Sequence, residues 1–185
     1  MLPLWGGLLG ALGAEIFLFA ARDLGDLAAA LAATIFWIVA GLTDRLALGF
    51  ARPWILNLGV SACWIIALQH FDSSRVLGSA VTAQSISRAG AISLAWVSRP
   101  AADGFGIASR IDTRLAAFAI VQGLLAAFIG GVRVGLLLIA ASYLVLRLMQ
   151  EWCYRRRGGI DATGFGVAQT AIELLAILVW SVIQF

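Results

Sequence analysis

The chain has 185 residues, of which 62% are hydrophobic and only 12% are charged, and its mean hydropathy is +0.96. Soluble domains carry about 25% charged residues, so this composition excludes a soluble protein and predicts an integral membrane protein. The chain has 13 basic residues, all arginine, and 10 acidic residues. The orientation of the protein in the membrane accounts for this basic excess without a nucleic-acid partner.

Apolar stretches recur along the chain, and a helix that crosses a bilayer needs about 20 residues. Because backbone groups in lipid must be paired and no barrel pattern is present, every span is predicted to be helical. We therefore expect an all-α, polytopic transmembrane bundle of about seven spans, forming a single integral membrane domain over residues 1–185. The predicted spans are residues 4–21, 27–42, 54–69, 76–97, 115–130, 134–149 and 164–185.

The first predicted span carries a packing motif and a carboxylate. Gly6 and Gly10 have a small-residue spacing that lets two membrane helices approach closely. Glu15 lies well inside the same span, where a carboxylate is costly, so it is expected to face the bundle interior or water. In the third span, Trp64 is available for a membrane interface.

The fourth predicted span is unusually polar. So many polar groups cannot face lipid, and neighbouring helices must satisfy them. Its arginine has two interpretations, pairing inside the bundle with Glu15 or Glu173, or contact with a substrate. The polar residues are Ser79, Thr82, Gln84, Ser85, Ser87 and Arg88.

Most arginines lie on one side of the predicted bundle, in or beside the loops after the second, fourth and sixth spans. Basic loops stay in the cytoplasm, so we expect a cytoplasmic N-terminus and polar loops that all face the cytoplasm. The opposite side receives only Arg22, Arg75 and Arg133. The cytoplasmic set is Arg45, Arg52, Arg99, Arg110, Arg114, Arg147, Arg155, Arg156 and Arg157.

The most polar and glycine-rich stretch lies in the predicted loop before the last span. Glycine permits close approach of the backbone to a ligand, and arginine binds phosphate in bidentate fashion. The pattern is compatible with a phosphate site at the membrane surface and with a basic anchor beside a flexible loop. Its central residues are Arg155, Arg156, Arg157, Gly158, Gly159 and Asp161.

Several short motifs, taken in order, resemble the cobalamin synthase family, the adenosylcobinamide-GDP ribazoletransferases of bacterial membranes. No single motif is decisive, but their order and spacing agree from about Ile86 to the C-terminus. The motifs are Leu2-Pro3-Leu4-Trp5-Gly6, Ile86-Ser87-Arg88-Ala89, Asp103-Gly104-Phe105-Gly106, Arg110-Ile111-Asp112, and Gly158-Gly159 followed by Gly166-Val167-Ala168 and Glu173-Leu174.

The resemblance implies a magnesium-dependent transferase of cobalamin biosynthesis in the bacterial cytoplasmic (inner) membrane. The α-ribazole hydroxyl would attack the cobinamide-linked phosphate of adenosylcobinamide-GDP, and GMP would leave. Asp44 and Asp161 would be the catalytic residues that hold Mg²⁺. The implied substrate-binding residues are Arg88, Asp103, Gly104, Gly106, Asp112, Arg157, Gly158 and Gly159.

The chain also departs from the family pattern. The family has an acidic, metal-binding element after the second span, and in the matching stretch Asp44 is the only carboxylate left, with Ala40 and Leu48 in two other places. Thr163 and Thr170 stand where the family has acidic residues. Loss of most of a metal cluster more often accompanies lost or altered chemistry.

Three hypotheses therefore remain open. The chain is a divergent, shortened transferase, a non-catalytic membrane partner of the corrin pathway, or a small transporter with Glu15, Arg88 and Glu173 as an intramembrane polar path. Expected partners are the lipid bilayer, a corrinoid nucleotide and α-ribazole, with no nucleic acid. A homo-oligomer or a complex with corrin enzymes is also open. Structural interpretations of Asp44 as a surface ion pair and of Asp103 as part of a turn stand beside the catalytic ones.

Overall fold

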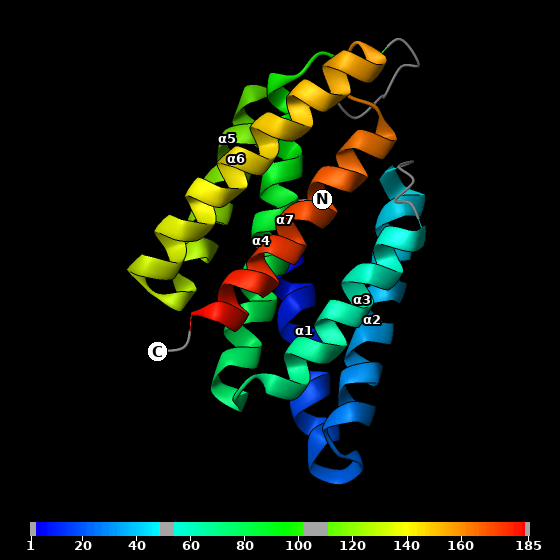
Figure 1. The fold of residues 1–185 in the computed structure, drawn as a ribbon, viewed down its shortest axis with the longest axis vertical. Coiled ribbons are helices and arrows are strands. Elements are labelled where there is room, and N and C mark those ends of the chain that lie inside the picture. The colour runs from blue at the N-terminus through cyan, green and yellow to red at the C-terminus, as the bar shows by residue number, and fades with distance from the viewer. Residues whose placement is uncertain (1–2, 49–53, 102–110, 184–185) are drawn as a thin grey trace.

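The computed structural model of the protein describes residues 3–48, 54–101 and 111–183, and within this range residues 42–48 and 54 are described by their backbone alone. Consecutive helices alternate in direction, so that the chain runs up and down the bundle (Figure 1). The described part contains no β-strand, which confirms the all-α prediction. The elements are α1 (Pro3–Leu24), α2 (Asp26–Leu48), α3 (Trp54–His70), α4 (Ser73–Val97), α5 (Thr113–Ala127), the 3-10 helix η1 (Phe128–Gly130), α6 (Val132–Arg157) and α7 (Ala162–Val182).

The helices have the dimensions and surface of a membrane bundle. Over the described ranges, α1, α5 with η1, α6 and α7 are long and apolar enough to cross a membrane, and α2 and α3 contain shorter apolar stretches. Large apolar side chains lie on the outside, including Phe19, Leu125 and Val182, each at least 69% exposed. Lipid is the solvent that such a surface requires. The bundle therefore agrees with the predicted polytopic membrane protein.

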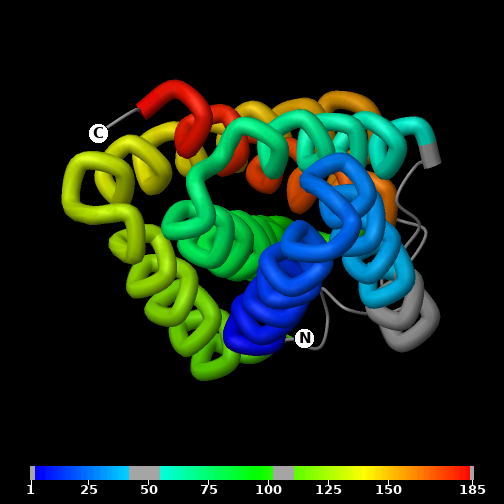
Figure 2. Tube along the Cα trace, turned by 90° about the horizontal axis from the view of Figure 1, so that it is seen from below, coloured from blue at the N-terminus to red at the C-terminus, as the bar shows by residue number. Residues whose placement is uncertain are grey.

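The polar helix α4 lies at the centre of the bundle. It packs against α1, α5, α6 and α7, and Figure 2 shows it surrounded by neighbouring helices. The polar side chains predicted to need partners are buried, and some of them find partners on neighbouring helices as predicted, while others bond within α4. Thr82 Oγ1 donates to the carbonyl oxygen of Ala126 on α5 at 3.1 Å, and Ser79 Oγ donates to the Val76 carbonyl oxygen at 3.0 Å.

Close packing of α1 on α4 depends on the predicted pair of glycines. A Cβ atom on Gly10 would lie 2.5 Å from the Ala80 carbonyl oxygen, and one on Gly6 would collide with the Gln84 carbonyl oxygen. The backbones of the two helices therefore meet directly along this face, as small-residue spacing allows. One turn further along α1, Trp37 of α2 covers Gly13 and donates its indole N–H to the Leu9 carbonyl oxygen at 2.9 Å.

Glu15 is exposed on the outer surface of α1, so of its two predicted environments the bundle interior is excluded and water is left. Two other sequence-based expectations need correction. Trp64 is 1% exposed and packs in the core against Trp37, so it is not an interface anchor. Helix α6 continues to Arg157, so the run of three arginines lies on a helix rather than in a loop. A helix that ends in arginines can extend beyond the hydrocarbon layer, because these side chains reach the interface.

We predict that Gly10→Ala weakens the bundle by about 1–3 kcal/mol, because the new methyl group must displace backbone atoms of α4. Thermal unfolding of the purified protein in detergent measures the change. Gly59→Ala is the matched control, since Gly59 is also helical but has open space where a Cβ would lie, and alanine there gains helix propensity. Equal melting temperatures for the two variants would contradict direct backbone contact between α1 and α4.

Candidate functional site

Several segments that contain predicted site residues meet at one end of the bundle. The C-terminal ends of α2, α4 and α6 and the N-terminal ends of α5 and α7 lie at the top in Figure 1. There the chain after α4 runs beside the link between α6 and α7, residues 158–161. The Ala101 N–H donates to the Ile160 carbonyl oxygen at 2.8 Å, and the Ile160 N–H donates to the Arg99 carbonyl oxygen at 2.9 Å. These two bonds form a parallel bridge. We use the name clasp for this bridge together with the side-chain contacts of Arg99.

Arg99 holds the clasp with its side chain as well as its backbone. Its Nε donates to the Gly158 carbonyl oxygen at 2.9 Å, and its guanidinium lies 5.3 Å from the ring centre of Tyr154. The Arg99 backbone N–H donates to the Tyr154 hydroxyl at 3.0 Å. The arginine distribution predicts Arg99 only as a basic loop residue. The available signal was Pro100, since a residue before proline favours extended backbone that can pair with another segment.

The two consecutive glycines meet different steric requirements of this link. Gly158 ends α6 in the left-handed conformation, with φ of 68°, and its N–H donates to the Tyr154 carbonyl oxygen at 3.1 Å. Glycine adopts this conformation without strain. A Cβ on Gly159 would lie 2.6 Å from the Arg99 carbonyl oxygen, so only glycine lets the two segments of the clasp approach.

Asp161 caps the next helix and pairs with Arg157. Its Oδ1 accepts the Gly164 N–H at 2.8 Å at the start of α7, and its Oδ2 forms an ion pair with the Arg157 guanidinium. A carboxylate at a helix N-terminus satisfies an unpaired donor and interacts favourably with the helix dipole. Asp161 is 7% exposed, whereas the Arg157 side chain is 40% exposed. The arginine therefore remains accessible from solvent on one side.

The other two arginines of the run point elsewhere. Arg155 forms an ion pair with Glu151, one turn earlier on α6. The guanidinium of Arg156 lies 5.7 Å from the ring centre of Trp152. Both contacts lie on the surface of α6, so within the described residues only Arg157 of the three turns toward the link.

The remaining predicted site residues are placed less closely. Asp112 is exposed and caps α5, with its Oδ1 accepting the Leu115 N–H at 2.7 Å. The backbone of Asp44 lies near the C-terminal end of α2, at the same end of the bundle (Figure 1). The predicted substrate-binding residues Asp103, Gly104 and Gly106 lie outside the described residues.

Arg88 lies in the interior of the bundle, in a polar network. Its Nη1 donates to the carbonyl oxygen of Gln84 at 2.9 Å and to its side-chain Oε1 at 2.6 Å. Gln84 donates in turn to Glu173 Oε1 at 2.7 Å, and Trp64 donates to the same oxygen at 3.0 Å. The predicted partner Glu173 thus belongs to this network through Gln84, while Glu15 lies outside the bundle.

This network is separated from the clasp. Arg88 precedes the end of α4 by about ten residues, which corresponds to about 15 Å along a helix. The structure therefore does not group Arg88 with Arg157, Gly158 and Gly159.

The donor atoms at this end limit how Mg²⁺ can bind. Among the described residues there is no group of three or more His, Cys, Asp or Glu side chains that could hold a metal. Both Asp161 oxygens have protein partners. Each carboxylate oxygen has more than one lone pair, and Mg²⁺ is often held by one or two carboxylates together with substrate phosphates. Asp161 therefore fits such a site as one ligand of a small set.

Comparison with known proteins identifies the family of the chain. A model of the cobalamin-5-phosphate synthase family matches residues 54–181, from the start of α3 almost to the end of α7. The match includes the clasp and the polar network, and it confirms the family that the sequence motifs indicated. It excludes α1 and the whole of α2, which contains Asp44. No curated protein and no solved structure matches the chain.

We predict that Gly159→Ala opens the clasp, because its methyl group occupies the space of the Arg99 carbonyl oxygen. Hydrogen–deuterium exchange should then accelerate about tenfold or more at the Ala101 and Ile160 amides, which corresponds to local destabilisation of about 1.4 kcal/mol. Gly41→Ala is the control, since a Cβ there meets nothing within 4 Å. Unchanged protection of both amides in Gly159→Ala would show that the glycine is not required for the bridge.

Proposed function

The chain belongs to the cobalamin-5-phosphate synthase family, and from that premise we propose that it acts as an adenosylcobinamide-GDP ribazoletransferase. The family assigns the chain a synthase role in cobalamin biosynthesis, and its apolar helices indicate a membrane protein. The ribazoletransferase reaction itself, its substrates and its magnesium dependence are the proposed part.

The proposed reaction is a displacement at phosphorus. A hydroxyl oxygen of α-ribazole forms a bond to the cobinamide-linked phosphorus of adenosylcobinamide-GDP. The phosphoanhydride bond to the guanosine monophosphate unit breaks, GMP leaves with the bonding electron pair, and the hydroxyl proton is released. Negative charge increases on the phosphate oxygens during this displacement, so catalysis depends on positioning and on nearby positive charge.

The observation that carries the proposal is the cation that the clasp fixes beside the link. Arg157 is the last residue of α6 and is partly exposed, and its ion pair with Asp161, the cap of α7, orients its guanidinium. An arginine in this setting can form bidentate hydrogen bonds to a diphosphate. Gly158 is exposed and has no side chain that would exclude a ligand, whereas Gly159 is buried against the Arg99 carbonyl oxygen.

Mg²⁺ would supply further positive charge to the diphosphate when bound, and Asp44 and Asp161 would hold it. Asp161 then serves two purposes, since it also caps α7 and orients Arg157. Asp103, Gly104, Gly106 and Asp112 remain proposed substrate contacts on the resemblance of their motifs. We propose that Arg88 stabilises the interior of the bundle and does not bind the substrate. It donates to Gln84 in the middle of α4, away from the clasp.

For this reaction the end with the clasp should face the cytoplasm, where the nucleotide substrate is available. We therefore propose a bacterial cytoplasmic membrane and a cytoplasmic N-terminus, in agreement with the arginine distribution.

A non-catalytic membrane partner of the corrin pathway is the second candidate. The observation in its favour is that both Asp161 oxygens are already used within the protein, while the described residues offer no carboxylate cluster. The transporter hypothesis loses support, because Glu15 lies on the outer surface of α1 and not in the network of Arg88 and Glu173.

We predict that the protein in lipid vesicles converts adenosylcobinamide-GDP and α-ribazole to adenosylcobalamin and GMP when Mg²⁺ is supplied. Asp161→Asn should reduce turnover about 100-fold, since it removes one electrostatic group of the site. Asparagine is a good helix cap, so the fold should remain. Chromatographic measurement of GMP release tests both expectations.

Arg156→Gln provides the matched control, because Arg156 stacks on Trp152 and does not reach the link. Its turnover should stay close to that of the unmodified chain. Turnover that is insensitive to chelation of Mg²⁺ and to Asp161→Asn would refute the assigned roles. No turnover by a folded protein that forms a stable complex with corrin enzymes would establish the partner hypothesis instead.

A further inference from the structure

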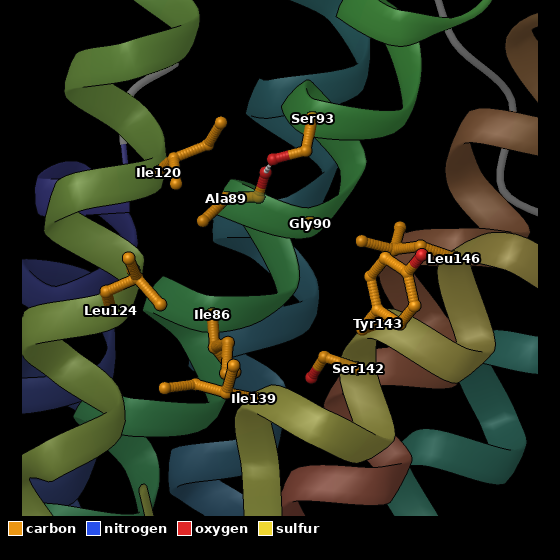
Figure 3. A pocket seen from close by; sticks show the side chains of 11 residues that line it. Ile86, Ala89, Gly90, Ser93, Ile120, Leu124, Ile139, Ser142, Tyr143 and Leu146 are labelled. Carbon is orange, nitrogen blue, oxygen red and sulfur yellow. Dashed lines mark hydrogen bonds between the residues drawn. The ribbon is translucent and has the colours of Figure 1, made fainter. Parts of the chain in front are cut away.

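A cavity of about 240 Å³ opens on the side of the bundle between α4, α5 and α6. Its walls are almost entirely apolar, and Figure 3 shows Ile86 of α4, Leu124 of α5 and Ile139 of α6 around it. This part of the molecule lies between helices predicted to span the membrane, so its opening faces lipid. The proposed reaction uses none of these residues.

A second cavity of about 260 Å³ continues the first along the side of α4 and α6. The two share Ser93, Tyr143 and Leu146, so they are adjacent, and we call them together the lateral groove. The groove ends at Arg147 and Gln150. It therefore runs from the apolar middle of the bundle to the cationic side chain of Arg147, ten residues before the end of α6.

Ser142 gives the groove wall an unusual polar atom. The residue is 6% exposed, and its hydroxyl has no hydrogen-bond partner among the described residues. In Figure 3 the hydroxyl points away from α6 into the space beside Ile86 and Ile139. A buried hydroxyl without a partner is costly, so an acceptor on a molecule in the groove would stabilise Ser142.

Arg147 supplies the charge at the mouth of the groove. It is exposed, it donates to Gln150 Oε1 at 3.2 Å, and it makes no ion pair within the part of the chain that the structure describes. Arginine near the end of a membrane helix extends its guanidinium to the interface, where lipid phosphates lie. A negatively charged headgroup therefore complements this end of the groove.

The two groups line different parts of the groove, Ser142 the first cavity and Arg147 the second. They are five residues apart on α6, which is about 7.5 Å along the helix axis and about 140° around it. In a glycerophospholipid the ester carbonyl and the phosphate are separated by a few bonds, and the acyl chain extends from the ester in the opposite direction. The groove presents a hydroxyl for the ester, a cation for the phosphate and an apolar channel for the chain.

We propose that the lateral groove binds an anionic glycerophospholipid, with one acyl chain between α4, α5 and α6. Ser142 donates to an ester carbonyl of the lipid, and Arg147 pairs with its phosphate. This site is distinct from the clasp and does not depend on the proposed transferase activity.

Native mass spectrometry of the full chain in non-ionic detergent, titrated with phosphatidylglycerol or phosphatidylcholine, tests the proposal. Phosphatidylglycerol should bind more tightly than phosphatidylcholine. Arg147→Gln should weaken phosphatidylglycerol binding about fivefold, the change expected from about 1 kcal/mol per arginine near anionic lipid. Arg133→Gln at the other end of α6 is the matched control and should leave that affinity unchanged.

A second pair of variants tests the channel itself. Ser93→Leu fills the junction of the two cavities and should abolish the bound lipid, whereas Ser93→Ala should retain it. Melting temperatures confirm that each variant is folded. If Ser93→Leu does not fold, the comparison of Arg147→Gln with Arg133→Gln decides alone.

Equal affinity for the two lipids, or equal effects of Arg147→Gln and Arg133→Gln, would overturn the proposal. A dimer that Ser93→Leu dissociates, with no bound lipid, would show that a second copy of the chain covers the groove instead.

Discussion

The fold depends on the burial of one polar helix inside an apolar bundle. Helix α4 carries hydroxyl, amide and guanidinium groups that lipid cannot satisfy, so other helices must surround it. The glycines of α1 bring that helix into backbone contact with one side of α4. On another side, Glu173 of α7 accepts hydrogen bonds from Gln84 and Trp64, which ties α3, α4 and α7 to the same carboxylate oxygen. The polar groups of α4 thus determine which helices are its neighbours.

The same arrangement positions the candidate site. Since α4 is fixed in the centre, the chain that leaves it at Arg99 passes beside the link between α6 and α7. The clasp converts this proximity into a defined geometry, in which Gly158 and Gly159 permit the approach and Asp161 orients Arg157. A site for a diphosphate requires a fixed cation more than a reactive side chain. The family membership and the clasp therefore support the same kind of chemistry.

Several residues of the candidate site could be predicted from the sequence, but the contacts that require those residues could not. The glycine pair, Arg157 and Asp161 were identified as one stretch, and the structure places Arg157 at the end of α6 and the other three in the link that follows. Their contacts with Arg99 depend on a segment about sixty residues earlier, and no local pattern reveals that pairing. Arg88 was grouped with them by motif resemblance, whereas its position in the middle of α4 separates it from the clasp.

The sequence by itself determined the membrane environment, the helical class, the need to bury α4 and the family, because composition, hydropathy and ordered motifs are properties of the chain alone. The tertiary structure decided which way each side chain points. Successive helical residues turn by about 100°, so three adjacent arginines acquire three different partners. For the same reason Trp64 lies in the core and Glu15 lies outside. Direction around a helix has meaning only once its neighbours are in place.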